Sequence, residues 1–257
     1  MDFLMKPAQD SHASHLIDET CLVTLDGKPL IAYINVPDDL SPVLKALKEI
    51  RYEKSFRSGG LPTNSRIFGY NPRSALRKDF CSSTSLAHEA APQHAEVCDA
   101  GKIAAHYYEK FNPALYVKHE AITNEKVLPY YQLPGTPFTS GIINKNNQLR
   151  YHRDNGNFED VWSAMFVFKK DVAGGHLVVP EIDCTFTLRD KSLFLFDGQG
   201  LIHGVTPIEF KGLNAYRYTI VYYSLKQIWN CQPIDEEVKR IRQLKTQRER
   251  KRAGVAA

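Results

Sequence analysis

The chain has 257 residues, of which 43% are hydrophobic, enough to bury a core without relying on disulfides or a structural metal. It contains no run of about 18 apolar residues and no basic stretch followed by an apolar one at its start, which argues against a membrane span and a secretory signal. The net charge of +4 equals the excess in residues 235–252, which hold eight Lys or Arg and four Asp or Glu, so the remaining chain is neutral with 25 residues of each sign.

The N-terminal half is predicted to be mostly helix and loop. Residues 1–20 are polar and expected to be loose. Two short strands around a turn are expected within Cys21–Val36. Apolar residues at helical spacing predict a helix near Leu40–Glu53, and a second helix is expected from about Gln93 to Phe111. Between these helices, Arg57–Ser85 is rich in Gly, Pro, Ser and Asn and is interpreted as a loop.

From residue 138 the pattern changes to seven short β-rich runs within about ninety residues, which is typical of a sandwich or barrel. A final helix is expected over Ile234–Arg252, docked through its apolar residues and projecting into solvent beyond Leu244. Its basic end is either a solvated helix or a tail that contacts phosphates. The predicted fold class is mainly β with flanking helices (α+β), divided into a helical and loop region (1–137), a β-rich core (138–230) and a basic C-terminal helix (231–257).

Three residues of the β-rich half form a candidate metal site. His152 and Asp154 are two apart, so on an extended segment they face the same side, and His203 follows 51 residues later in another short apolar run. Two imidazoles and one carboxylate leave about three open positions, which suits non-haem Fe(II) better than zinc. His152-Arg153-Asp154 also matches the start of a protein-kinase catalytic loop, but the other kinase motifs are absent.

Arg217 is a candidate anion-binding residue because it lies on an otherwise apolar strand-like run. A buried guanidinium needs an anionic partner, and the far carboxylate of a dicarboxylate co-substrate can form a bidentate pair with it. Thr219 lies on the same face and can add a hydroxyl donor. The alternative is an arginine on an edge strand that pairs with Asp or Glu.

The five cysteines are far apart, odd in number and form no CxxC pair. We therefore expect reduced thiols rather than a disulfide framework or a zinc knuckle. Reduced thiols are typical of the cytoplasm, or of the nucleus in a eukaryote.

Five segments between Gly141 and Ser224 form a characteristic series: YHRDNGN (Tyr151–Asn157), VWSAMFVF (Val161–Phe168), GGHLVVPE (Gly174–Glu181), SLFLFDGQGLIHGVTPI (Ser192–Ile208) and YRYTIVYYS (Tyr216–Ser224). With these segments, the stretch resembles the TET/JBP family of nucleobase dioxygenases. A further segment, Arg66–Phe80, is similar to one that precedes the core in small microbial and fungal members.

The resemblance implies a double-stranded β-helix, or jelly roll, flanked by helices. It implies that His152, Asp154 and His203 bind Fe(II), while Arg217 and Thr219 bind 2-oxoglutarate, with dioxygen as the other co-substrate. The substrate would be a methylated base in DNA, most often 5-methylcytosine, or thymine in the JBP branch. The cysteine-rich extension of the large animal members and the separate base-binding domain of the JBP kind are not found in this sequence.

A base inside a duplex cannot reach a buried metal, so the nucleotide would have to be flipped out. We expect contacts to the base from the polar and aromatic residues beside the metal motif, namely Tyr151, Asn155, Asn157 and Phe158. We expect contacts to phosphates from Arg66, Arg73, Arg77, Lys78, Arg248, Arg250, Lys251 and Arg252.

Two other hypotheses fit the same sequence. The first keeps the chemistry and changes the substrate to thymine, a protein side chain or a small metabolite. The second is a non-catalytic DNA-binding jelly roll whose metal-like residues are structural. The identity of the base, the preference for single or double strands and the oligomeric state are open at this point.

Overall fold

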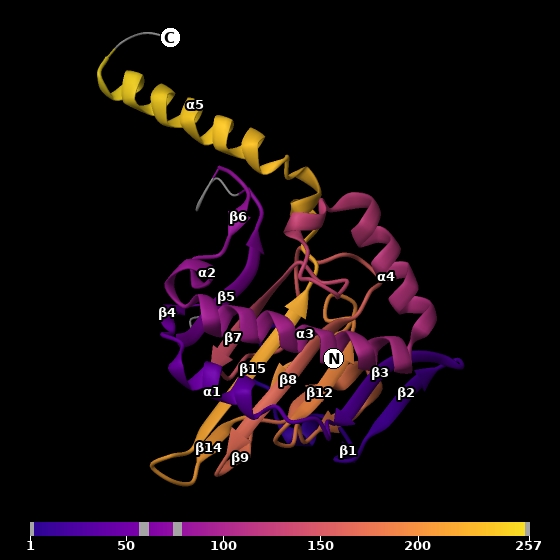
Figure 1. Ribbon diagram of the computed structural model, residues 1–257. Helices are drawn as coiled ribbons and strands as arrows, with labels where there is room; N and C mark the ends of the chain where they lie inside the picture. The colour runs from indigo at the N-terminus through magenta and orange to yellow at the C-terminus, as the bar shows by residue number, and fades with distance from the viewer. Residues whose placement is uncertain (1–2, 57–61, 74–78, 255–257) are drawn as a thin grey trace.

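The structure, a computed structural model, describes residues 3–56, 62–73 and 79–254 and consists of two facing β-sheets with helices on the outer side of the larger one (Figure 1). Within these residues the major sheet has nine strands and the minor sheet has four. The major sheet runs in the order β2 (Cys21–Leu25), β3 (Lys28–Asn35), β12 (Ser192–Phe196), β8 (Ser163–Lys170), β15 (Tyr216–Tyr223), β7 (Ser140–Lys145), β5 (Pro62–Asn71) and β4 (Glu53–Phe56), with β6 (Ser82–Ser83) paired to β5.

The minor sheet and the helices complete the architecture. The minor sheet runs in the order β1 (His15–Ile17), β11 (Cys184–Phe186), β10 (Leu177–Val179) and β13 (Gly204–Val205), and β9 (Val172–Gly174) pairs with β14 (Ile208–Phe210). The helices are α1 (Ser41–Glu49), α2 (Leu86–Glu89), α3 (Ala91–Phe111), α4 (Pro113–Lys126) and α5 (Ile234–Arg252). Among the described residues, none of these helices is long and apolar enough to cross a membrane.

The major sheet is buried on both faces because its side chains alternate between two cores. Leu193 and Leu195 of β12 pack under the helices, whereas Phe194 and Phe196 point to the minor sheet. Each such side chain contributes about 1.5–3 kcal/mol when fully buried, so a strand with two apolar faces is held from both sides. The prediction of a jelly-roll core with flanking helices is confirmed.

The seven β-rich runs predicted from residue 138 each contain a strand, and the two strands predicted within Cys21–Val36 are β2 and β3. The helix predicted near Leu40–Glu53 is α1, which ends at Glu49, because the chain then turns into β4. The helix predicted from Gln93 is α3, and α4 was not predicted because its apolar residues follow no clear helical spacing.

Two predictions for the N-terminal region are wrong. The stretch interpreted as a loop contains the ten-residue strand β5, which pairs with β7 on one side and with the edge strand β4 on the other. Residues 1–20 are not loose in the described part, because β1 pairs with β11 and Ala8 is buried. Tertiary pairing overrides the polar local composition in both cases.

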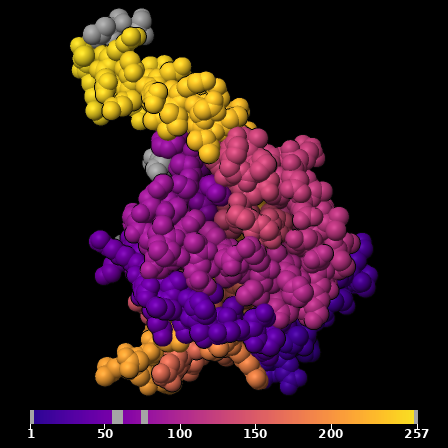
Figure 2. Space-filling model, in the orientation of Figure 1, coloured from indigo at the N-terminus to yellow at the C-terminus, as the bar shows by residue number. Residues whose placement is uncertain are grey.

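The C-terminal helix α5 projects away from the body, as the space-filling view shows most clearly (Figure 2). Of the apolar residues expected to dock it, Ile234 and Val238 are exposed. The residue that anchors it is Glu237, which is 2% exposed and forms an ion pair with Arg73. Ile241 and Leu244 are half-buried, so docking combines a buried ion pair with partial burial of the apolar residues.

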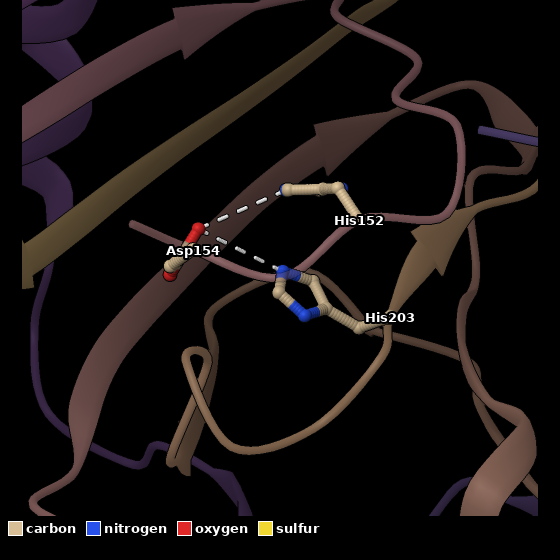
Figure 3. Close-up of side chains that lie close together, drawn as sticks. All are labelled: His152, Asp154 and His203. Atoms are coloured by element: carbon tan, nitrogen blue, oxygen red, sulfur yellow. Dashed lines mark ion pairs between the residues drawn. The ribbon is translucent and has the colours of Figure 1, made fainter. Parts of the chain in front are cut away.

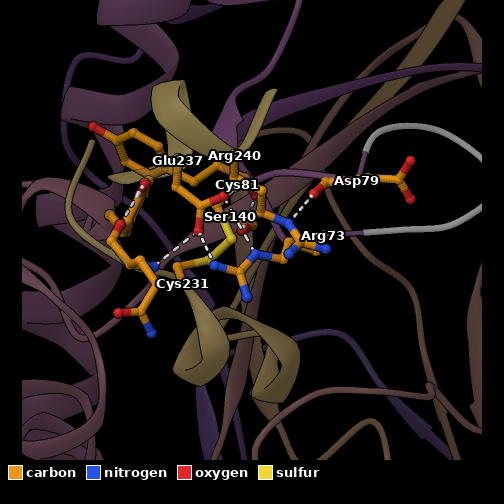
Figure 4. The surroundings of a disulfide bond; sticks show 10 residues. Arg73, Asp79, Cys81, Ser140, Cys231, Glu237 and Arg240 are labelled. Atoms are coloured by element: carbon orange, nitrogen blue, oxygen red, sulfur yellow. Dashed lines mark hydrogen bonds and ion pairs between the residues drawn. A yellow bond between two sulfur atoms is a disulfide. The ribbon is translucent and has the colours of Figure 1, made fainter. Parts of the chain in front are cut away.

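A disulfide joins Cys81 to Cys231 at the base of α5 (Figure 4). The expectation that all cysteines are reduced is wrong for this pair, because the fold brings together two residues 150 positions apart, with a Cα–Cα distance of 5.7 Å. Spacing in the sequence carries no signal for so distant a pairing. Cys21, Cys98 and Cys184 are free thiols.

Candidate active site

Three possible metal ligands converge between the two sheets (Figure 3). Asp154 Oδ1 lies 3.8 Å from His152 Nε2 and 4.0 Å from His203 Nε2. One ligand atom from each residue lies within 4.8 Å of the others. The structure thus brings together the three residues that the sequence nominated, in a set that suits non-haem iron.

Both imidazoles present the correct nitrogen to a metal. His152 Nδ1 lies 2.8 Å from the carbonyl oxygen of Arg150, and His203 Nδ1 lies 3.0 Å from that of Leu201. Because a carbonyl only accepts, each Nδ1 carries the proton and each Nε2 keeps its lone pair. Burial lowers the pKa of His203 to about 4 although the Asp154 carboxylate opposes the shift, so this imidazole is neutral near pH 7. The donor set therefore fits Fe(II).

Backbone hydrogen bonds fix the segments that carry these ligands. His152 and His203 exchange two N–H···O=C bonds of 2.9 and 3.0 Å, and the Asp154 N–H donates to the Gly198 carbonyl at 2.8 Å. A Cβ at Gly198 would lie only 2.4 Å from Asp154 Oδ2, so glycine leaves room for the carboxylate. The ligand geometry is set by the main chain before any ion binds.

Glu181 ties the two ligand segments together from the side. Its carboxylate accepts the N–H of Ile202 at 2.6 Å and pairs with Arg153. Ile202 precedes one ligand and Arg153 lies between the other two. Sequence reasoning quoted Glu181 as part of the GGHLVVPE segment but assigned it no role.

Arg217 lines the same cavity as the three possible metal ligands. Its guanidinium is buried and has no anionic partner among the described residues. Its side chain is 2% exposed, its Nε and Nη2 atoms form no hydrogen bond, and no carboxylate of the described residues pairs with it. Burial lowers its pKa to about 10, which leaves it cationic at neutral pH. Since β15 is flanked by β8 and β7, the alternative of an edge-strand ion pair is excluded.

The surroundings of Arg217 form a cradle for an anion. A Cβ at Gly175 would lie 3.0 Å from Arg217 Nε, so the glycine lets the main chain approach the guanidinium. Lys169 is its cross-strand neighbour. Burial, and after it the positive charge of Arg217, lowers the pKa of Lys169 to about 8. The Lys169 ammonium donates to the Thr187 carbonyl at 3.0 Å, so the two Arg217 donors without partners among the described residues are what point to a carboxylate.

Thr219 lies on the cavity-facing side of β15 with Arg217, as the alternation of the strand predicted. Its Oγ1 accepts a hydrogen bond from Asn144 Nδ2 at 3.1 Å, which leaves the hydroxyl proton for a ligand. Asn147 Nδ2 donates to Asn144 Oδ1 at 3.0 Å and so fixes the amide. Sequence reasoning missed these two asparagines, although the polar run Asn144–Asn147 just before the metal motif is their signal.

The three possible metal ligands, Arg217, Thr219 and the two asparagines line one cavity of about 910 Å³. This is near the upper end for ligand pockets and leaves room for two small ligands. The polar part of its lining includes the three possible metal ligands, Arg217 and Thr219. The apolar part of its lining includes Ile142, Leu149, Met165, Leu177, Phe196 and Val221.

The residues expected to contact a base lie in different settings. Asn155 is exposed and lines the cavity, and Asn157 lines it while buried. Tyr151 also borders the cavity, but its ring is fully buried against Phe3 and its hydroxyl lies 3.1 Å from His12 Nδ1. Phe158 is buried in a separate apolar cluster, away from the cavity. The two asparagines are the residues left available to a substrate.

The expected phosphate contacts of the 57–85 stretch need correction. Arg66 is 4% exposed and forms ion pairs with Glu53 and Glu89, so its charge is already neutralised inside the protein. Arg73 pairs with Glu237 at the base of α5. Arg77 and Lys78 lie outside the described residues. In α5, Arg248 pairs with Asp79, whereas Arg250, Lys251 and Arg252 are exposed.

Comparison with known proteins gives a consistent family signal. A profile of the Tet_JBP family, the oxygenase domain of the 2OGFeDO superfamily, matches residues 67–226. The chain is 26% identical over 201 residues to thymine dioxygenase JBP1 of Trypanosoma brucei brucei. It is 25% identical over 210 residues to the bifunctional helicase and thymine dioxygenase JBP2 of Leishmania tarentolae. Each match covers 77% of this chain but only 23% and 18% of the relative, so the chain spans less than a quarter of their length.

Among solved structures, the fold is similar to that of NgTET1 in complex with 5mC DNA. The TM-score is 0.58 and the identity 14%, with 90% of each chain covered. At this identity the likeness concerns the fold, and it extends over the flanking helices as well as the jelly roll.

Proposed function

Because the chain belongs to the Tet_JBP family of oxygenase domains in the 2OGFeDO superfamily, we propose that it is an iron(II)- and 2-oxoglutarate-dependent dioxygenase that hydroxylates the methyl group of a DNA base. The observation that carries this proposal is that one cavity holds both the His152–Asp154–His203 set and the buried guanidinium of Arg217, which has no anionic partner among the described residues. A metal site alone would fit several chemistries. A metal site beside a buried guanidinium fits a co-substrate that chelates the metal at one end and carries a carboxylate at the other.

In this proposal His152, Asp154 and His203 hold the metal. Fe(II), with 2-oxoglutarate and dioxygen, supplies the oxidation that replaces a methyl C–H bond by C–OH, while the 2-oxo acid loses carbon dioxide and becomes succinate. The Nδ1–H bonds to main-chain carbonyls orient both imidazoles, so that each Nε2 faces the position of the metal. Glu181 holds the two ligand segments in register through Arg153 and Ile202.

Arg217 and Thr219 would bind the carboxylate of 2-oxoglutarate that is distant from the metal. A guanidinium offers two parallel N–H donors to a carboxylate, and the two donors of Arg217 without partners supply them. The hydroxyl of Thr219, fixed by Asn144, adds a third donor. Binding here would also satisfy the charge of a cation that is otherwise buried without an anion.

The methyl group would belong to a pyrimidine base, with 5-methylcytosine as the first candidate. Thymine is the second candidate, because the named relatives are thymine dioxygenases. Both bases carry the methyl group at the same ring position and differ at position 4, where one has an amino group and the other a carbonyl. The amides of Asn155 and Asn157 at the cavity can donate to one and accept from the other.

DNA is the proposed partner, with the target nucleotide flipped into the cavity. The wall residues are apolar, and a base that leaves the stack gains contacts there that offset part of its unstacking. The exposed Arg250, Lys251 and Arg252 at the end of α5 would contact phosphates.

Nucleoside mass spectrometry tests the proposal. The chain is incubated with Fe(II), 2-oxoglutarate and oligonucleotides that carry 5-methylcytosine, thymine or N-methylated bases. We expect a hydroxymethyl product from 5-methylcytosine or thymine, with succinate in equal amount, and no product with His203→Ala. Turnover of 2-oxoglutarate that oxidises no base in any oligonucleotide would redirect the proposal to a protein side chain or a small metabolite.

A further inference from the structure

The N-terminal segment Phe3–Ala13 forms a fixed edge of the active-site cavity. The Met5 N–H donates to the Tyr151 carbonyl at 2.8 Å, and the Tyr151 N–H donates to the Lys6 carbonyl at 3.0 Å. Ala8 is buried beside Gly204, where a Cβ would lie 2.9 Å from the Ala8 side chain. The segment is therefore bonded to the same stretch of chain that supplies the metal ligand His152.

The tip of this segment is a tight turn with two large apolar residues at its centre. The Lys6 N–H donates to the Phe3 carbonyl at 3.0 Å, which places Leu4 and Met5 at the two central positions. Met5 has a φ of +64°, a conformation usually taken by Gly or Asn at this place in a turn. Arg150 Nη1 donates to the Met5 carbonyl at 3.2 Å and helps to hold the turn.

Leu4 and Met5 line the cavity but are also exposed to solvent, unlike the buried apolar residues of its walls. They line the cavity that holds His152 and Arg217, yet their side chains are 45% and 43% exposed. The apolar wall residues Leu177 and Val205 of the same cavity are buried. The tip therefore stands at the mouth of the cavity and presents its apolar side chains outward, to whatever approaches the metal.

We propose that the Leu4–Met5 turn is a wedge that enters the base stack of duplex DNA and fills the space left by the flipped nucleotide. This inference rests on the proposed function, since it takes the substrate to be a base in DNA. Apolar side chains of this size are used between base steps by proteins that unstack DNA, because they replace the lost stacking interactions. Lys6, exposed directly after the turn, would lie near the phosphates.

The wedge implies that the chain acts on double-stranded substrates whose target base is paired, because it offsets the cost of unstacking that base. A base that is mismatched or single-stranded is already unstacked in part, so a wedge gives it little advantage. Removing the wedge should therefore slow oxidation in a way that depends on how the target base is paired. A role as a simple lid would slow all substrates alike.

The test compares a wedge variant with a matched control. Leu4→Ala combined with Met5→Gly removes both side chains and leaves the turn intact, because glycine readily adopts the φ of +64°. Leu213→Ala is the control, since Leu213 is fully exposed on the segment between β14 and β15 and does not line the cavity. Each protein is assayed on one sequence as a paired duplex, as a duplex with the target opposite an abasic site, and as a single strand.

We expect the wedge variant to lose about tenfold or more in kcat/KM on the paired duplex, while its rates on the other two substrates change less than about twofold. The fluorescence of 2-aminopurine beside the target should rise on binding of the wild type and rise less with the variant. Equal losses on all three substrates, or no loss on the paired duplex, overturn the wedge and leave the proposed function standing. A wild type that oxidises none of the three overturns the proposed function as well.

Discussion

The active-site cavity and the C-terminal helix α5 are held in place by different means. The three possible metal ligands are fixed by main-chain hydrogen bonds between segments distant in the sequence, in the space between the two facing sheets. Helix α5 is exposed along most of its length and is anchored at its base by the Cys81–Cys231 disulfide and by Glu237. The proposed active site is therefore held by many main-chain contacts, whereas α5, the proposed DNA contact, is held by a few contacts that can be removed one at a time.

The largest effect on activity is expected at the proposed metal site. His203→Ala should lower the turnover of 2-oxoglutarate by about a thousandfold or more, because it removes a ligand that the fold positions in advance. Steady-state kinetics at saturating Fe(II) measures this loss. His106→Ala, at an exposed histidine of α3, serves as the control and should retain wild-type turnover. Comparable rates in the two variants would show that the triad does not hold the metal.

The next largest effect is expected at the anchor of α5. Cys231→Ser should lower the free energy of unfolding by about 2–5 kcal/mol, because the disulfide closes a loop of 150 residues in the unfolded chain. Chemical denaturation with and without reductant measures it. Reductant should destabilise the wild type to the level of the variant and leave the variant unchanged. Identical midpoints for oxidised and reduced wild type would mean that the bond contributes nothing.

Arg217→Lys tests the anion cradle. Lysine keeps the charge but loses the two parallel donors, so the KM for 2-oxoglutarate should rise about tenfold to a hundredfold with a smaller change in kcat. Initial rates over a range of 2-oxoglutarate concentrations separate the two parameters. A KM that stays at the wild-type value would remove Arg217 from the binding of the co-substrate.

Glu237 gives α5 a pH dependence of known sign. Burial alone would raise the pKa of its carboxyl, but the hydrogen bonds from Arg73 and from the N–H groups of Gln232 and Cys81 outweigh it and hold the pKa below its usual 4.5. The carboxylate therefore stabilises the fold above about pH 4.5, and this stabilisation is lost as the pH falls through the folded-state pKa. The difference in unfolding free energy between wild type and Glu237→Gln should be about 1–3 kcal/mol at pH 7 and shrink in acid. A difference that stays constant from pH 7 to pH 3 would contradict this assignment.

The smallest effect is expected at the end of α5. Changing Arg250, Lys251 and Arg252 to Gln should weaken DNA binding and make the salt dependence shallower by about 0.9 in log–log slope for each phosphate that the helix no longer binds. Fluorescence anisotropy at several salt concentrations measures both. The control changes Lys28, Lys126 and Lys211 to Gln, which are exposed on other parts of the surface. Equal slopes for the two triple variants would exclude the helix end as a DNA contact.

The sequence predicted the parts of the site whose signal is local or repeated. His152 and Asp154 are two apart on an extended segment, and Arg217 interrupts an apolar strand, so their shared faces follow from alternation alone. What it missed depends on distant pairing. The polar stretch that became β5, the Cys81–Cys231 bond and the burial of Arg66 between two glutamates all arise only when remote segments meet. The ordered tip at Leu4 and Met5 belongs to the same group, because its hydrogen bonds are to residue 151.

A crystal structure obtained without oxygen, with Fe(II) and 2-oxoglutarate added, would show directly which residues hold the metal and the co-substrate. We expect one iron ion bonded to His152, Asp154 and His203, and the distal carboxylate of 2-oxoglutarate on the guanidinium of Arg217. Iron bound at other residues, or a carboxylate held elsewhere while Arg217 keeps no partner, would contradict this expectation.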